Sequence, residues 1–313
     1  MFGTCRFIFI FIILPFVLVF NGVAEPADII QSKAAIVISQ SIRPYLGAAE
    51  GLRQELVQNS GAEIEEFDLD RLEGKGYDIL LEDLKKGGFD IFIAIGPSAA
   101  RFIWSSFPSP DVKKLYTMVL DPENIKAMPQ AACGIALRIP IKPQLQLISS
   151  GLPEVKRLGI LYDPRYSMDL ILQAIKNSSD LELKIIPLVI SSKREIPSVL
   201  AQNWKNIDAL LFIPDRTVIS ESIIQYIIKE AVLKNSAVVG YNKFFYESGA
   251  ALAFLLDYQE IGKQTGRIAA RILSGEGCTK EPPIFHAWVN ERVLQKLGIE
   301  LLKEYPPPLE TGP

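Results

Sequence analysis

Residues 89–97 read Phe-Asp-Ile-Phe-Ile-Ala-Ile-Gly-Pro, and this stretch decides the fold of the chain. Its apolar run, 91–95, follows an aspartate and ends at a Gly-Pro turn, as expected for a parallel strand buried on both faces. Residues 207–214, Ile-Asp-Ala-Leu-Leu-Phe-Ile-Pro, repeat the order of an apolar residue, an aspartate, an apolar run and a proline. The repeat indicates that one structural plan occurs twice.

Strands and helices are expected to alternate around both copies. In the first half the patterns predict strands at 34–39, 64–69, 91–95 and 115–120, and helices at 44–59, 76–86 and 99–107. In the second half they predict strands at 157–162, 183–189, 209–213 and 237–240, and helices at 143–150, 168–177, 196–203 and 221–235. Two such runs predict an α/β protein with two Rossmann-like lobes, each built on a parallel sheet.

The N-terminus has the pattern of a secretory signal. Arg6 precedes an apolar run, 7–20, and the small residues Gly22 and Ala24 follow it. We therefore expect a signal peptide over 1–24, cleavage after Ala24 and a periplasmic protein. An uncleaved membrane anchor is the alternative, but the run is shorter than the roughly 20 residues that span a membrane, and Pro15 interrupts it.

Charge and cysteine content restrict the partners. The formal net charge is −3 and the isoelectric point is near 5.5, which gives no reason to expect a nucleic-acid partner. After the signal, Cys133 and Cys278 remain; a disulfide is possible in an oxidising compartment, but we favour two free thiols. Together with the single histidine, His286, they cannot form an ordinary structural zinc site, so neither metal nor cofactor is expected.

The predicted strands end in small and polar residues. In an open parallel sheet, ligands bind beyond the carboxyl ends of the strands, where backbone N–H groups favour anions. These strand ends are Ser39-Gln40-Ser41, Gly96-Pro97-Ser98, Asp121-Pro122, Tyr162-Asp163-Pro164, Asp215-Arg216-Thr217 and Tyr241-Asn242. Two lobes carrying such ends would enclose a ligand cleft.

A resemblance to a known family extends over the whole chain after the signal. It is carried by Gly-Ala-Ala-Leu-Ala at 249–253, Leu-Asp-Tyr at 256–258 and Ile-Gly-Lys-Gln-Thr-Gly-Arg-Ile-Ala-Ala-Arg-Ile-Leu-Ser-Gly-Glu at 261–276, with further similarity at 94–100 and 153–162. In these stretches the chain resembles the ABC-transporter substrate-binding family that includes the tryptophan/tyrosine-type binding proteins, with the type I periplasmic-binding-protein fold.

The resemblance implies a hinge in which the chain crosses three times between lobes. It places an N-terminal lobe at 25–138 plus 254–285 and a C-terminal lobe at 139–253 plus 286–313. It also implies that a monomer closes around one small polar organic ligand, amino-acid-like compounds included, and docks on an ABC permease in the membrane. A ligand sensor that acts through a membrane receptor is the alternative.

The candidate ligand-binding residues follow from the strand ends and the resemblance. They are Ser39, Gln40, Ser41, Gly96, Pro97, Ser98, Asp121, Tyr162, Asp215, Arg216, Thr217, Tyr241 and Asp257. Asp215 would hold a ligand ammonium group if the family pattern applies, and an N-cap is its alternative role. The family's usual Asp-Asn-Thr is Asp215-Arg216-Thr217 here, which leaves the identity of the ligand open.

Catalytic motifs are missing from the sequence. It has no Gly-x-Ser-x-Gly elbow, no Walker loop and no Gly-x-Gly-x-x-Gly after a strand. A carboxylate pair such as Asp215 and Asp121 could in principle do acid–base work across the cleft, which makes a hydrolytic enzyme a further alternative, but nothing in the sequence requires it. We therefore expect a binding protein and no enzyme.

Overall fold

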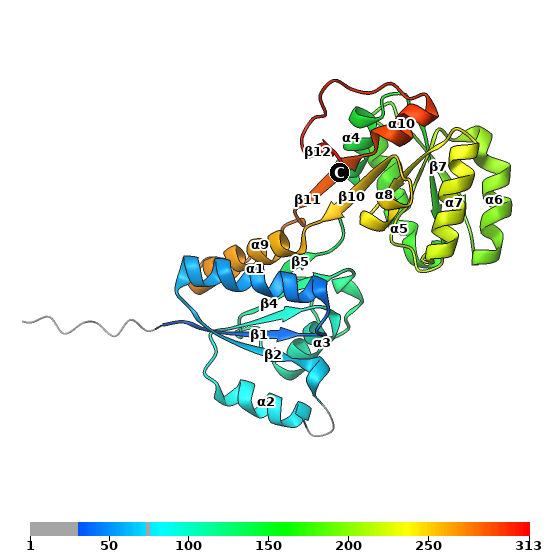
Figure 1. Cartoon of the computed structure of the whole chain (residues 1–313). Coiled ribbons are helices and arrows are strands. Elements are labelled where there is room, and N and C mark those ends of the chain that lie inside the picture. The colour runs from blue at the N-terminus through cyan, green and yellow to red at the C-terminus, as the bar shows by residue number, and fades with distance from the viewer. Residues whose placement is uncertain (1–30, 73–75) are drawn as a thin grey trace, which may run out of the picture. The chain divides into compact units, whose positions relative to one another are not determined.

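The computed structural model describes residues 31–72 and 76–313 (Figure 1). The expected signal peptide, 1–24, lies outside the described residues. Within the described part of the chain, no helix is both long and apolar enough to cross a membrane.

The first sheet consists of five parallel strands in the order β2-β1-β3-β4-β5. They are β1 Lys33–Ile38, β2 Glu63–Asp68, β3 Ile91–Ile95, β4 Lys114–Val119 and β5 Gly134–Ala136. The stretch at 91–95 is β3, in the middle of the sheet, and all its residues are buried. Helices α2 (Gly76–Lys86) and α3 (Pro97–Ser106) pack on one face. Helices α1 (Arg43–Ser60) and α9 (Tyr258–Leu273) pack on the other.

The second sheet has seven strands in the order β12-β11-β10-β9-β8-β6-β7. They are β6 Arg157–Tyr162, β7 Lys184–Val189, β8 Ala209–Leu211, β9 Ala237–Gly240, β10 Leu252–Leu256, β11 Phe285–Val289 and β12 Leu309–Thr311. Only β10 and β11 pair antiparallel among the described strands. The order β7-β6-β8-β9-β10 matches β2-β1-β3-β4-β5, so the two sheets share one topology, as the repeated stretch predicts.

Helices also cover both faces of the second sheet. They are α4 Ile141–Gly151, α5 Pro164–Ser178, α6 Ile196–Asn203, α7 Glu221–Leu233, α8 Lys243–Glu247 and α10 Glu291–Leu297. One core cluster joins the sheet to α4, α5 and α10, and another joins it to α6, α7 and α8. The continuous apolar runs of the central strands are explained by this burial on two sides.

The aspartate of each repeated stretch has the same structural role. The Asp90 carboxylate accepts a hydrogen bond from the Lys33 N–H at 2.8 Å, at the start of β1. The Asp208 carboxylate accepts from the N–H groups of Lys156 and Arg157 at 3.0 and 2.7 Å, at the start of β6. Each aspartate thus fixes the beginning of the neighbouring strand, which explains why the two stretches share it.

Helix α9 packs on the first sheet, although strands of the second sheet precede and follow it in the chain. Figure 1 shows α9 (orange) beside α1 (blue). The two backbones approach so closely that a Cβ atom at Gly51 would overlap the Gln259 carbonyl, and one at Gly262 would overlap the Ala48 carbonyl. Glycine is therefore needed at both positions.

The chain crosses between the two sets of elements three times: from β5 to α4, from β10 to α9 and from α9 to β11. Strand β10 continues in the second sheet to Leu256, beyond the lobe limit expected at residue 253. The last crossover is held by Gln264 of α9, whose side chain donates to the Pro282 carbonyl at 2.9 Å and accepts from the Ile284 N–H at 3.2 Å.

Cys133 and Cys278 form a disulfide, with their Cα atoms 6.1 Å apart. The expectation of two free thiols is therefore wrong. The Cα separation lies within the usual range for a bridge. The two cysteines are 145 residues apart in sequence, and packing of α9 on the first sheet brings them together. Sequence spacing alone contains no sign of this contact.

Candidate functional site

A cavity of about 230 Å³ lies where the crossover segments meet the carboxyl edge of the second sheet. The first crossover contributes 137–139; Leu256 at the end of β10 and Tyr258 at the start of α9 lie on either side of the second. The loops after β8 and β9 contribute Pro214 and Tyr241. The remaining lining residues are Leu120, Gln144, Leu170, Ile213, Ile219 and Asn242. The lining is mostly apolar with a few polar groups, the usual character of a small-molecule site.

Two polar side chains fix the first crossover beside this cavity. Arg138 forms an ion pair with Asp121, which follows β4. Gln144 of α4 is buried, and its amide donates a hydrogen bond to the Ile139 carbonyl at 2.8 Å. The segment 137–139 is thus tied both to the first sheet and to α4.

Two tyrosines, Tyr241 and Tyr258, line the cavity. Burial raises the pKa of Tyr241, and the negative charge of Asp215 raises it further. Burial also raises the pKa of Tyr258. Both phenols therefore stay protonated at neutral pH and are available as hydrogen-bond donors to a ligand.

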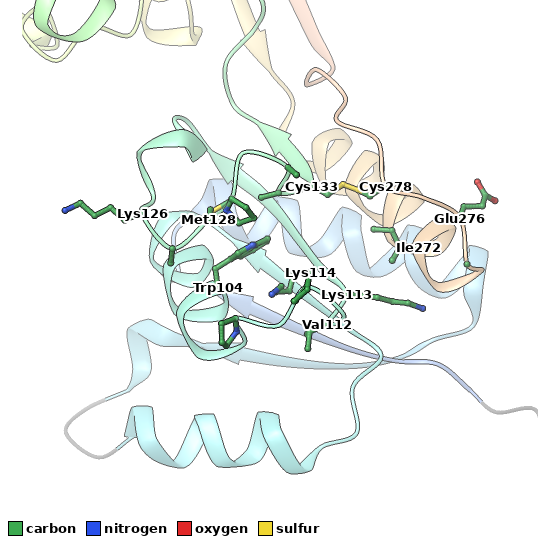
Figure 2. A pocket seen from close by; sticks show the side chains of 17 residues that line it. Trp104, Val112, Lys113, Lys114, Lys126, Met128, Cys133, Ile272, Glu276 and Cys278 are labelled. Carbon is green, nitrogen blue, oxygen red and sulfur yellow. A yellow bond between two sulfur atoms is a disulfide. The ribbon is translucent and has the colours of Figure 1, made fainter.

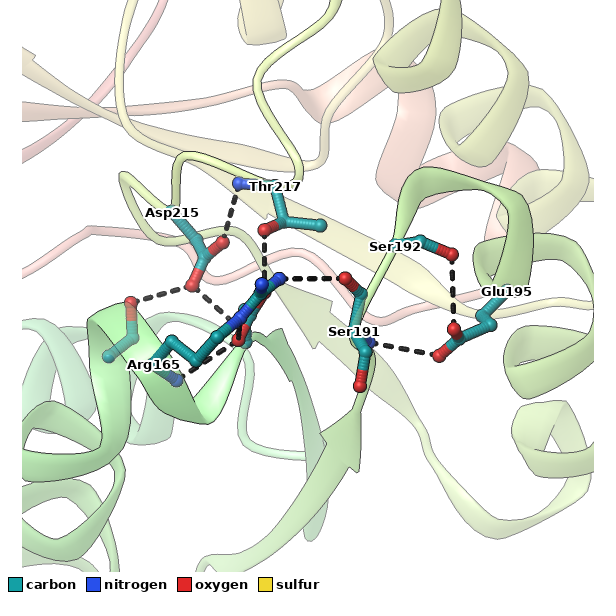
Figure 3. Close-up of polar contacts among 8 residues, drawn as sticks. Arg165, Ser191, Ser192, Glu195, Asp215 and Thr217 are labelled. Carbon is teal, nitrogen blue, oxygen red and sulfur yellow. Dashed lines mark hydrogen bonds and ion pairs between the residues drawn. The ribbon is translucent and has the colours of Figure 1, made fainter.

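Asp215 is at the centre of a polar network at the carboxyl edge of the second sheet (Figure 3). Its carboxylate is fully buried. It accepts hydrogen bonds from the Asp163 N–H at 3.0 Å, the Ser167 hydroxyl at 2.7 Å and the Thr217 N–H at 2.9 Å. These contacts join the loops after β6 and β8, so Asp215 acts inside the protein as a structural acceptor.

Asp163 extends this network toward solvent. It caps α5 by accepting from the Arg165 N–H at 3.0 Å, and the Thr217 hydroxyl donates to it at 2.8 Å. Its side-chain hydrogen bonds and ion pair with Arg165 hold the pKa of its carboxyl well below the usual range. Figure 3 shows Arg165 also reaching the Ser191 carbonyl, at 2.8 Å, in the loop after β7.

The strand ends of the first sheet form a separate group. The Ser39 hydroxyl accepts from the Ala99 N–H at 2.9 Å and so caps α3. Gly96 has a φ of 89°, and a Cβ there would lie 2.7 Å from the Ser39 hydroxyl oxygen. Ser41 contacts Asp68 at the end of β2. Gln40, Pro97 and Ser98 are exposed beside them.

The remaining predicted residues take different positions. Tyr241 lines the cavity directly, whereas Tyr162 is buried in the core of the second lobe. Arg216 is exposed, and its guanidinium lies 5.7 Å from the centre of the Tyr166 ring. Asp257 caps α9 by accepting from the N–H groups of Gln259 and Glu260.

Sequence reasoning missed several cavity residues, chiefly Arg138, Gln144, Leu170 and Tyr258. Arg138 carried a usable signal, because it is a charged residue between Leu137 and Ile139 at the expected lobe limit. A charge inside an apolar crossover needs a partner or a ligand. Leu170 and Gln144 are ordinary helix residues in sequence and carried no such signal.

A larger cavity, of about 790 Å³, opens in the first lobe, beside the start of β4 and the end of α9. Figure 2 shows Trp104, Met128 and the Cys133–Cys278 bridge around it, with Lys113 and Lys114 at the start of β4. None of the predicted ligand-binding residues lines it.

Duplicated parallel sheets, three crossovers and a cavity at the crossovers define the class of two-lobed ligand-binding proteins with the type I periplasmic-binding fold. The chain belongs to the ABC transporter substrate binding protein family, which matches residues 45–305. The expected fold class and family are therefore confirmed.

Known proteins support this assignment. A tyrosine-binding protein of Clostridioides difficile (strain R20291) is 21% identical to this chain over 228 residues. The match covers 68% of this chain and 64% of that protein, so less than two thirds of the relative is matched. The ligand-free, open structure of a substrate binding protein with adhesive properties from Clostridium difficile has a TM-score of 0.72 at 20% identity, covering 90% of this chain and 99% of that one. An ABC domain in complex with L-Trp from Streptococcus pneumonia has a TM-score of 0.56 at 17% identity, covering 87% and 96%. At these identities the solved structures show a shared fold.

Proposed function

We propose that this protein captures a small organic ligand outside the cytoplasm and delivers it to the permease of an ABC importer. The observation that carries the proposal is the cavity at the crossovers, lined by Arg138, Tyr241 and Tyr258. Membership in the substrate-binding family supports the transport role.

The position of the cavity supports a coupling between binding and closure. Its walls include 137–139 of the first crossover, and Leu256 and Tyr258 on either side of the second. A ligand that contacts these segments binds one hinge conformation better than another, and so shifts the population toward it. We propose 25–138 plus 254–285 and 139–253 plus 286–313 as the lobes that move, with the limit in β10 adjusted to Leu256.

The remaining parts of the proposal concern export and assembly. We propose that 1–24 is removed after Ala24, and that the protein acts as a periplasmic monomer that performs no catalysis. Ser39, Gly96 and Thr217 are proposed as parts of the binding cleft. Because one relative is named for tyrosine and one neighbouring structure contains L-Trp, aromatic amino acids are the first compounds to test.

A thermal-shift screen of the purified protein tests the proposal. Amino acids, small carboxylates and nucleosides would be compared, since a ligand at 100-fold its Kd stabilises the folded state by about 2.7 kcal/mol. Leu137→Trp fills the cavity and should abolish the shift, whereas Val57→Trp adds the same ring to an exposed position of α1 and should preserve it.

The alternatives give different results. Conversion of the stabilising compound into a product, detected by mass spectrometry, would overturn the absence of catalysis. A screen without any stabilising compound, or a ligand that binds Leu137→Trp as tightly as the unaltered protein, would contradict the proposed site.

A further inference from the structure

The acidic side chains near the cavity are already engaged inside the protein. Asp215 has three internal donors, Asp163 is paired with Arg165, and Asp121 is paired with Arg138. Asp163 and Asp215 expose 1% of their surface or less. Asp257 is exposed, but its Oδ1 accepts from two amides of α9. A ligand ammonium group would have to displace internal donors to reach Asp163 or Asp215.

Arg216, in contrast to these acidic residues, has no partner of opposite charge inside the described part of the protein. It is exposed and makes no ion pair among the described residues. Its guanidinium lies 5.7 Å from the centre of the Tyr166 ring, and that of Arg165 lies 5.4 Å from the same ring. Arg165 is paired with Asp163, so Arg216 is the cation without an ion pair among the described residues beside the Tyr166 ring, which is 51% exposed.

The segments that carry this cation–aromatic pair also contribute residues to the cavity lining. Tyr166 lies four residues before Leu170 on α5, so the two share one helix face about 6 Å apart along the axis. Leu170 lines the cavity, as do Pro214 and Ile219 on either side of Arg216 in the chain. A ligand seated against Leu170 and Pro214 would therefore extend toward Tyr166 and Arg216.

We propose that the ligand is a small organic carboxylate with an aromatic part, that its carboxylate pairs with Arg216, and that binding requires no ammonium group. This inference rests on the proposed function and narrows its substrate class. The planar guanidinium matches a carboxylate in a bidentate geometry. The apolar lining and the exposed Tyr166 ring suit an aromatic body. Arg216 would then be a specificity-determining residue.

Calorimetry with compounds that share one ring but differ in charge tests the inference. The probes are 3-(4-hydroxyphenyl)propanoate, tyrosine and tyramine, with benzoate and phenylacetate as shorter carboxylates. We expect at least one carboxylate without an ammonium group to bind as tightly as tyrosine or more tightly, and tyramine not to bind.

Variants connect this preference to the named residues. Arg216→Ala should weaken carboxylate binding about 10-fold to 100-fold, because a charge-assisted pair is lost. Arg216→Lys should weaken carboxylate binding less, because lysine keeps the positive charge and loses only the bidentate geometry of the guanidinium. Tyr166→Leu should weaken aromatic carboxylates by about 2-fold to 10-fold. Arg292→Ala, which removes another exposed arginine without an ion pair among the described residues, should leave the affinity unchanged.

Several results would overturn the inference while leaving the proposed function intact. Binding of tyrosine that is lost when its ammonium group is removed would show that the ammonium is required. The inference would also be overturned if the ligand found in the screen were neither aromatic nor a carboxylate. Unchanged affinity in Arg216→Ala would overturn it as well. Failure of every compound in the broad screen would instead count against the proposed function.

Discussion

At the scale of single residues, Asp163 connects the stability of the binding edge to pH. Its carboxylate is ionised and bonded in the folded state, where Arg165 lowers its pKa. In the unfolded chain an aspartate has a pKa of about 3.9. Above that pH the carboxylate is charged in both states and its bonds stabilise the fold. Below it the unfolded state takes up a proton that the folded state does not, so the free energy of unfolding falls.

Asp163→Asn tests this dependence. The variant should be less stable than the unaltered protein at pH 7, and the difference should shrink between pH 4 and pH 3. Urea unfolding at pH 7, 4 and 3 measures the free energies. Asp169→Asn, an exposed position on the same helix, should follow the unaltered protein at each pH. A constant difference between Asp163→Asn and the unaltered protein would contradict the assignment.

The candidate site could be predicted from sequence only in part. Strand-end reasoning identified Tyr241 and the loop containing Asp215, because parallel strands place their carboxyl ends at one edge. It could not show that Asp215 points inward. That direction depends on Ser167 and the Asp163 N–H, which lie about 50 residues earlier in the chain. Leu170 was missed because an apolar helix residue has the same pattern whether it lines a cavity or a core.

At the scale of elements, the contact between α1 and α9 depends on glycine. Gly262→Ala would place a methyl group against the Ala48 carbonyl and push the helices apart. We expect a loss of about 1–3 kcal/mol in the free energy of unfolding, as for other overpacked positions. Gly277→Ala is the matched control, because a Cβ there would have no neighbour within 4 Å. Equal urea midpoints for the two variants would argue against a close helix contact.

Most elements of the two lobes could be predicted from periodicity. The predicted strand at 91–95 is β3 and that at 157–162 is β6, with the same ends. The expected helices match to within a few residues; α5, for instance, begins at Pro164, four residues before the expected start at 168. Short elements such as β5, β12 and α8 were not predicted, since three to five residues contain too little of a period to recognise. Tertiary pairing determines these elements.

At the scale of the whole molecule, the Cys133–Cys278 bridge joins two residues that are 145 positions apart in the sequence. Replacing both cysteines by serine, or reducing the bridge, should lower the free energy of unfolding by about 2–4 kcal/mol. Urea unfolding with and without reductant measures the change. The double variant should show no further response to reductant. A reductant-insensitive unaltered protein would indicate that the bridge does not form in solution.

The placement of α9 in the first lobe has a consequence for the order in which the protein can be completed. A ribosome releases α1 early, but 258–273 only when most of the chain has been synthesised. Until then the apolar side of α1, with Ala48, Leu52 and Leu56, has no helix to cover it. The lobe that begins first is thus finished nearly last. A nascent or truncated chain that stops before residue 273 displays that apolar surface, which marks it as incomplete to chaperones and proteases.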